Sequence, residues 1–340
     1  MKKLIIFLSA LIIYCLTTIK TVYAQDIHFS QFYASPMSLN PAETGFFDGN
    51  WRFTNNYRTQ WSAIGVPYNT ISAGFEKPFK LNKNSNFGLG VFFINDKSGS
   101  SQLTVNKLFL SGNYMLTIDN IHNFGIGVQL GYVVKSFSID GLTLPSQYNT
   151  NTGYFDPNLP NNINTWEENI NYPDLNLGFA YKGKSGKLNP FGGLALFHII
   201  NPKESFLRAE DKLPMRLVMH GGIEYALKKN IIIKPNLLTM YHKRAGDWII
   251  STLGYYLLPQ GKMIDKVFVG IQGRTAINTF DAIIFTGGVS LYDFDLGISY
   301  DINISKLSAA TNNKGAFEIS IIYKDLTKQL TKIALPCDRY

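Results

Sequence analysis

One stretch of the sequence, Gly178 to Ser185, matches the phosphate-loop pattern G-x-x-x-x-G-K-[ST]. Phosphate binding needs a strand before the first glycine and a helix that starts at the lysine, because backbone N–H groups must converge on the phosphate. Here Gly178 lies inside an alternating apolar segment, and a turn-forming run, Gly186–Pro190, follows the match. The stretch therefore predicts a hairpin, and nucleotide binding is not expected.

Histidine and serine are the other residue types that could do chemistry. The five histidines are His28, His122, His198, His220 and His242. None has the i, i+4 spacing of a helical metal site, and no G-x-S-x-G pattern supplies a serine nucleophile. We expect these histidines to lie in a lumen or at an interface. No catalytic residue, metal site or cofactor is expected, and the chain is not expected to be an enzyme.

The elements that would position such groups follow from composition and periodicity. Of the 340 residues, 45% are hydrophobic, 14% are aromatic and only 16% are charged, whereas soluble domains are about one-quarter charged. This composition excludes a disordered chain, a collagen-like chain and a coiled coil. The length allows two domains, but all-β barrels often exceed about 200 residues as one unit.

Residues 1–24 have the form of a secretory signal peptide. Two lysines lead into an apolar stretch, Leu4–Leu16, and Ala24 supplies a small residue at the cleavage position. We therefore expect an exported mature chain that begins at Gln25. It has no run of about 18 apolar residues, so no transmembrane helix is expected. Cys337 would be its only cysteine, which excludes an internal disulfide.

Apolar residues alternate with small polar residues along much of the mature chain. In Asn123–Lys135 one face carries large apolar side chains and the other is mostly Gly and Gln, and Phe294–Ile302 repeats the pattern. Segments of about ten residues with this alternation are typical of a transmembrane β-barrel. At about 3.3 Å per residue and about 45° of tilt, ten residues cross about 23 Å, close to the apolar band of such barrels.

We predict an all-β protein, a transmembrane antiparallel β-barrel of about fourteen strands within residues 50–325. An even strand number agrees with bacterial single-chain barrels. The predicted strands are 50–61, 68–79, 86–96, 102–117, 122–138, 172–183, 190–200, 216–227, 229–242, 247–257, 265–276, 280–290, 292–302 and 316–325.

The connections between these segments support the count. In an even-numbered barrel with periplasmic termini, the odd connections face outside and are the longer ones. The long connections 139–171, 201–215 and 303–315 follow the fifth, seventh and thirteenth segments, and the even turns are short. The even turns are also basic, through Lys83, Lys184, Lys187, Lys228 and Lys262. This basic rim fits simple solubility, a partner or anionic headgroups.

Charge argues against a nucleic-acid partner. The formal net charge of +8 falls to +5 without the three lysines of the signal peptide. A charge of this size spread over rim turns does not form the clustered basic footprint that nucleic-acid binding requires.

Two segments lie outside the predicted strands. Residues 25–49 contain prolines and glycines, so we expect neither a strand nor a long helix there, and we place them at the periplasmic mouth or in the lumen. Phe29, Tyr33, Leu39 and Trp61 are the candidate anchors of a plug. The connection 139–171, rich in Asn, Pro and Tyr, is expected to be an exposed loop, either functional or a plain surface cap.

The start of the mature chain also carries a family motif. Asp26–Gly45 reads D-I-H-F-S-Q-F-Y-A-S-P-M-S-L-N-P-A-E-T-G, and Asn56–Trp61 reads N-Y-R-T-Q-W. Parts of Asn201–Arg216 and Ser299–Ser320 agree as well. The chain resembles the PorP/SprF family of outer-membrane proteins in the type IX secretion system of Bacteroidota. The motif or plug positions singled out are His28, Phe29, Tyr33, Asn40, Pro41 and Trp61.

The resemblance implies an outer-membrane barrel that assists export or surface attachment of specific cargo with a C-terminal sorting domain, of the gliding-adhesin type. Implied partners are that cargo, the translocon, the periplasmic ring lipoproteins and outer-membrane lipid. The tail, residues 326–340, resembles the family's Cys-Pro-Arg-aromatic ending, with Asp338 in place of proline. The alternative is a general porin or a hydrophobic-substrate channel, because a barrel fold alone does not define a function.

Overall fold

The computed structural model describes residues 27–99, 103–138, 145–160, 169–206, 211–243, 245–259, 263–276, 279–306 and 308–326. The predicted signal peptide, Cys337 and the tail beyond Leu326 lie outside these ranges. Within them, no helix is long and apolar enough to cross a membrane.

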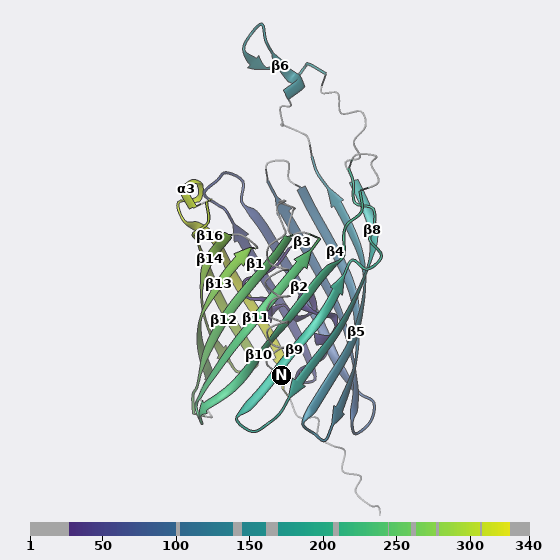
Figure 1. The fold of residues 1–340 in the computed structure, drawn as a ribbon, viewed down its shortest axis with the longest axis vertical. Coiled ribbons are helices and arrows are strands. Elements are labelled where there is room, and N and C mark those ends of the chain that lie inside the picture. Colours follow the sequence, from purple (N-terminus) through teal and green to yellow (C-terminus); the bar gives the residue numbers. More distant parts are fainter. Residues whose placement is uncertain are drawn as a thin grey trace, which may run out of the picture.

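Fourteen antiparallel strands form a closed barrel in which the first strand pairs with the last (Figure 1). The strands are β1 (Trp51–Gln60), β2 (Tyr68–Lys80), β3 (Ser85–Ser98), β4 (Leu103–Ile118), β5 (His122–Ser136), β8 (Asn169–Gly183), β9 (Leu188–Phe197), β10 (Arg216–Lys228), β11 (Ile231–His242), β12 (Ala245–Leu257), β13 (Ile264–Ala276), β14 (Thr279–Leu291), β15 (Phe294–Asn303) and β16 (Lys314–Asp325). A one-turn helix, α3 (Ser308–Thr311), lies between β15 and β16.

The predicted barrel is confirmed, since each of the fourteen predicted segments overlaps one observed strand. One turn differs in detail. The short connection expected at Leu291–Tyr292 is a two-residue turn at Tyr292 and Asp293, and Tyr292 has a left-handed backbone conformation with φ 52°. A small hairpin was not predicted. Its strands, β6 (Tyr148–Asn149) and β7 (Tyr154–Phe155), follow a 3-10 turn, η3 (Pro145–Gln147), and have only two residues each, too few to show alternation.

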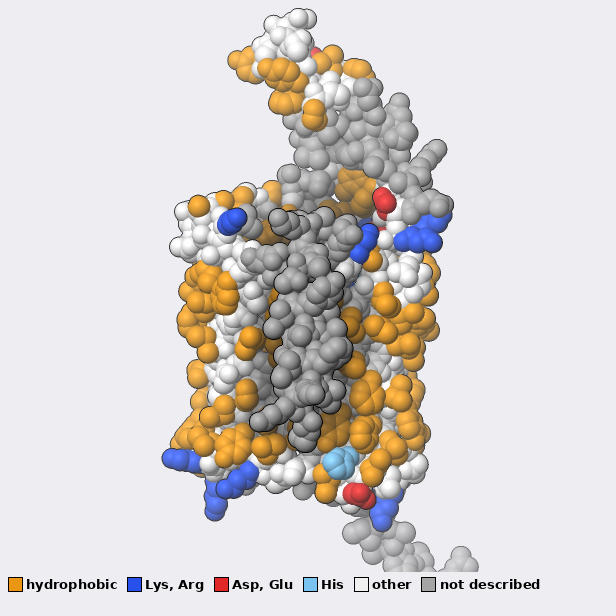
Figure 2. Space-filling view, in the orientation of Figure 1, with side chains coloured by type: hydrophobic (Ala, Val, Ile, Leu, Met, Phe, Trp, Pro, Cys, Tyr) orange, Lys and Arg blue, Asp and Glu red, His pale blue; other side chains and the backbone are white. Residues whose placement is uncertain are grey.

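The two faces of the barrel wall differ as the alternation predicts. In β5, Ile126 is 62% exposed and Leu130 59%, whereas Gln129 between them is buried. Figure 2 shows the outward side chains as a broad apolar belt. An exposed apolar surface of this extent fits a lipid environment rather than water.

The two ends of the barrel also differ. We call the end where β1 begins and β16 ends the short-turn rim; the turns that carry Lys83, Lys184 and Lys187 lie there, and Lys228 is the last residue of β10 at the same rim. The opposite end, the long-loop rim, carries the β5–β8 connection and its hairpin (Figure 1). Basic side chains gather at the ends of the barrel in Figure 2. The expected separation of long loops from short basic turns is therefore confirmed for the described residues; Lys262 lies outside them.

Residues 27–49, which we call the luminal segment, lie inside the barrel. They form three single turns: η1 (Phe32–Ala34), α2 (Pro36–Leu39) and η2 (Pro41–Glu43). The segment runs down the lumen, because Ser30 contacts Glu318 in the half nearer the long-loop rim, and the Phe46 carbonyl accepts a hydrogen bond from Lys182 near the short-turn rim. It then continues into β1.

Local sequence explains why this segment turns repeatedly. Pro36 and Pro41 occupy the first positions of α2 and η2, where a missing N–H costs nothing. The Asn40 side chain accepts the Ala42 N–H at 2.9 Å and so caps η2. Gly45 has φ +67°, which directs the chain toward the wall.

Candidate functional site: the luminal segment and the cavity beneath it

Five of the six positions singled out from the sequence lie in the luminal segment. Phe29, Asn40 and Pro41 are buried, and His28 and Tyr33 are half-buried. Burial raises the pKa of the Tyr33 phenol well above its usual range, so the hydroxyl stays neutral. The structure thus brings these family-motif residues together inside the lumen.

Trp61, the sixth position, lies elsewhere. It follows β1 at the long-loop rim, where its backbone N–H donates to the Gly315 carbonyl at 2.9 Å. Its ring meets Tyr68 edge-on, with 5.0 Å between centroids. The expectation that Trp61 anchors the luminal segment is therefore corrected: the chain turns at Trp61, with φ 57°, into the loop that leads to β2.

A buried carboxylate holds the upper part of the luminal segment. Glu318 of β16 accepts the backbone N–H groups of Ser30 at 2.7 Å and Gln31 at 2.9 Å. The Gln31 side-chain oxygen accepts a hydrogen bond from Ser320 at 2.8 Å. Arg58 of β1 pairs with Glu318, so the carboxylate is neutralised and is hydrogen-bonded at both of its oxygens.

A second carboxylate, Asp301, completes this ionic cluster. It accepts the Ser30 hydroxyl at 2.9 Å and an N–H of Arg274 at 2.8 Å. Arg58 also reaches Asp301, at 3.3 Å. Asp301 is fully buried, and Arg58 and Arg274 are only 3% and 4% exposed. Two acids and two arginines from four strands thus converge on Ser30.

Asn40 and its neighbours form the middle contact. The Asn40 amide donates to the Phe179 carbonyl at 2.9 Å and lies 3.1 Å from a ring nitrogen of His220. The Asn113 amide donates to the carbonyls of Ala42 at 2.7 Å and Thr44 at 3.1 Å. Asn40 therefore connects the segment to β8 and β10, and Asn113 of β4 connects the residues that follow it to another part of the wall.

Glycines on the inner wall let the segment approach this closely. A Cβ on Gly127 would collide with the carbonyl carbon of Pro41, and a Cβ on Gly178 would collide with the Asn40 side chain. Gly127 of β5 thus gives the luminal segment a flat surface of the inner wall to pack against. Gly178, the first glycine of the phosphate-loop match, lies within β8, and Lys184 and Ser185 lie in the following turn.

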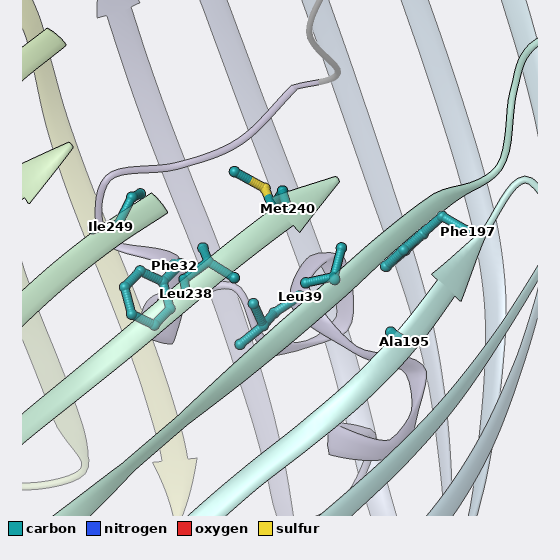
Figure 3. Packing of buried hydrophobic residues seen from close by; sticks show 8 residues of the cluster. Phe32, Leu39, Ala195, Phe197, Leu238, Met240 and Ile249 are labelled. Atoms are coloured by element: carbon teal, nitrogen blue, oxygen red, sulfur yellow. The ribbon is translucent and has the colours of Figure 1, made fainter. Parts of the chain in front are cut away.

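Apolar contacts fill the part of the lumen that is lined by β9 to β12. Figure 3 shows Phe32 and Leu39 of the luminal segment among side chains of the inner wall. The wall residues of this cluster are Ala195, Phe197, Val218, Leu238, Met240 and Ile249. Full burial of a Phe or Leu side chain contributes about 1.5–3 kcal/mol relative to exposure, so the segment is held by packing as well as by charge.

An ion pair closes the lower end of the segment. Lys182 of β8 donates to Glu43 at 2.6 Å and to the Phe46 carbonyl, and lies 4.2 Å above the Phe46 ring. Burial is the largest single effect on the Glu43 carboxyl and raises its pKa, but the Lys182 ammonium, together with His220 and Arg52, more than offsets burial and holds this pKa below its usual value.

This pair makes the docking of the lower segment dependent on pH. The pKa of Glu43 is lower when the segment is docked in the lumen than when it is undocked. The ionised carboxylate therefore stabilises docking fully above the pKa of the undocked state, and this stabilisation is lost as pH falls through the pKa of the docked state. We expect Lys182→Met to reverse this pH dependence of docking. Burial then raises the pKa of Glu43, so lower pH favours docking. Protection of the Thr44 and Gly45 amides from hydrogen exchange, measured between about pH 4 and about pH 7, checks this. Glu43→Gln is the control and should show neither trend.

A cavity of about 650 Å³ lies beneath the luminal segment, and we call it the vestibule. Phe32, Tyr33 and Leu39 form part of its roof. Lys184 of the β8–β9 turn and Leu326 after β16 place its mouth at the short-turn rim. Its size is in the range of ligand-binding pockets. A molecule that enters from this rim meets the luminal segment instead of an open passage.

Sequence reasoning missed the charged residues of the lumen. Arg58 stands in the N-Y-R-T-Q-W motif, but its partners Glu318 and Asp301 lie more than 240 positions further along the chain. A signal was present, because Arg58, Asp301 and Glu318 fall on the small-polar face of their predicted strands and therefore point into the lumen.

Solved structures identify the class of protein. Pseudomonas putida toluene transporter TodX has 10% identity and a TM-score of 0.51, over 89% of this chain and 95% of that one. The CymD monoaromatic hydrocarbon channel has 11% identity and a TM-score of 0.51, over 86% and 92%. A Pseudomonas aeruginosa FadL homologue has 10% identity and a TM-score of 0.50, over 85% of this chain and 93% of that one. At these identities the likeness shows the fold, an outer-membrane β-barrel.

The particular family follows from the sequence. The family model described as type IX secretion system membrane protein PorP/SprF matches residues 21–323, nearly the whole chain. The chain therefore belongs to the PorP/SprF family and is an outer-membrane component of the type IX secretion system. No curated protein matches the sequence. By the rule for such barrels, the short-turn rim faces the periplasm.

Proposed function

We propose that this protein is a non-enzymatic accessory that assists export or surface attachment of specific cargo with a C-terminal sorting domain, of the gliding-adhesin type. The observation that carries the proposal is family membership over residues 21–323. The cargo, the translocon and the periplasmic ring lipoproteins are its proposed partners. The filled lumen supports a docking role, because a channel needs a continuous path and the luminal segment lies across it.

A clean in-frame deletion tests this function. We expect one or a few large sorting-domain proteins to leave the cell surface and to accumulate or be degraded inside, with other export intact. Surface, culture-fluid and periplasmic proteins are compared with those of the wild type and of the complemented strain. Unchanged export in the deletion strain would contradict the proposal.

The luminal segment is proposed to act as a plug. Replacing Phe29 and Tyr33 together by Ala should then raise ion leak through the purified barrel in planar bilayers, because their packing inside the lumen is lost. Phe285→Ala with Tyr300→Ala is a matched control, since this Phe–Tyr pair is 50% and 41% exposed on the outer face. Equal leak in both variants and in the wild type would count against the plug.

The second candidate function is a channel for small hydrophobic substrates. It is favoured by the fold likeness to hydrocarbon channels and by the aromatic residues that line the vestibule, among them Phe191, Tyr255 and Phe268. The deletion strain separates the two candidates. Loss of uptake of a labelled monoaromatic hydrocarbon, with normal export, would favour the channel; lost surface cargo with normal uptake would favour the accessory.

A further inference from the structure

The vestibule has an excess of positive charge that its own carboxylates leave uncompensated. Lys266 and Lys324 share one acid, Asp295, at 3.2 Å and 2.8 Å. Lys234 is 4.0 Å from Glu224, whose side chain is 42% exposed. Three lysines thus have one carboxylate at hydrogen-bond distance among the contacts of the described residues. An anionic group at this place would gain from all three.

The same lysines stand against aromatic rings. Lys234 lies 4.6 Å above the Phe191 ring and Lys266 lies 5.9 Å from the Tyr255 ring centre. The roof adds Phe32 and more apolar surface. The vestibule therefore offers ammonium groups beside flat apolar surfaces, which suits a ligand with both carboxylates and apolar side chains.

A buried acceptor supplies a further point of attachment. Asn236 of β11 lines the vestibule and is 6% exposed. Its side-chain oxygen has no hydrogen-bond partner within the described part of the chain. Such an orphaned acceptor costs free energy unless a donor arrives, and a peptide N–H is a suitable donor.

We propose that the vestibule binds a carboxylate-bearing peptide segment that enters from the periplasm. The barrel wall separates the cavity from the bilayer, and the luminal segment blocks its inner end, so the occupant must come through the short-turn rim. Polypeptides are what a secretion component meets on that side. The choice of a polypeptide as the occupant rests on the proposed function.

Binding of labelled peptides to the purified, detergent-solubilised full chain tests the proposal. The probe is a fluorescent hexapeptide of alternating Glu and Phe; the same peptide with Gln for Glu is the charge control. We expect binding of the acidic peptide to be at least about tenfold tighter, a difference of about 1.4 kcal/mol. Equal binding of the two peptides would overturn the proposal.

Matched variants locate the binding. Lys234→Gln with Lys324→Gln should abolish the preference for the acidic peptide, and Lys266 remains to neutralise Asp295. Lys83→Gln with Lys228→Gln removes the same charge from the short-turn rim and should leave the preference intact. If only the rim variant loses the preference, binding is to the rim and the proposal is wrong.

A third measurement does not depend on the lysine variants. In Asn236→Cys combined with Cys337→Ser, which leaves the new thiol as the target of labelling in the mature chain, the acidic peptide should slow maleimide labelling and the Gln peptide should not. Slowing by short-chain phosphatidylglycerol but not by the acidic peptide would overturn the proposal in favour of a lipid. These outcomes are separate from the deletion test: peptide binding without an export defect would refute the accessory function alone, and an export defect without binding would refute the vestibule proposal alone.

Discussion

Replacing Glu318 by Ala should release the upper part of the luminal segment. The buried Glu318 carboxylate accepts hydrogen bonds from the backbone N–H groups of Ser30 and Gln31 and neutralises Arg58. Removing one partner of a buried ion pair costs about 3–5 kcal/mol, because the other charge is left uncompensated. At about 1.4 kcal/mol per factor of ten, protection of these two amides from hydrogen exchange should fall by about 10²- to 10³-fold.

The matched control for this variant is Glu224→Ala. That carboxylate also faces the lumen, but its side chain is 42% exposed and its nearest lysine is 4.0 Å away. Solvent screens such a pair, so the control should change the exchange of the Ser30 amide little. Heat-modifiable mobility on gels verifies that both barrels are folded. Wild-type protection in Glu318→Ala would show that the ionic cluster does not hold the segment.

Gly127→Val should expel the middle of the luminal segment and open the barrel. The new side chain would occupy the place of the Pro41 carbonyl group and the Ala42 nitrogen, which are backbone atoms and cannot rotate away. Overpacking costs about 1–3 kcal/mol and more where backbone must move. We expect a steady ion conductance in planar bilayers, at least about tenfold above the wild-type leak.

Gly254→Val is the control for this experiment. Its Cβ would meet only a backbone oxygen at 3.9 Å, an ordinary contact. It changes the same residue type to the same side chain in another strand, β12. A closed Gly127→Val barrel together with a closed control would mean that the segment can move aside without leaving the lumen.

Much of the fold was predictable because strand alternation is a local property. Each strand, such as β5 or β15, carries its own apolar and small-polar faces, and connection lengths then define the two rims. The position of residues 27–49 was predictable only as a pair of alternatives, the mouth or the lumen. Local sequence shows that the segment cannot be a strand, but not which wall it contacts.

The contacts of the site could not be predicted for the same reason. Ser30 meets Asp301 and Glu318, and Asn40 meets His220, only after the barrel closes. Trp61 shows the converse: its place in a family motif suggested a shared role with Phe29, but it lies at the long-loop rim. Membership of the same sequence motif does not show that two residues are close in space. The period-2 pattern of a strand, in contrast, does show whether a side chain points into the lumen or outward.

Single-channel recording of the unmodified protein tests the central claim most directly, namely that the luminal segment closes the barrel. The purified chain is inserted in planar bilayers and recorded beside Gly127→Val, which verifies insertion. We expect the wild type to show no steady conductance while the variant conducts. A stable, porin-like conductance of the wild type, equal to that of the variant, would contradict the account.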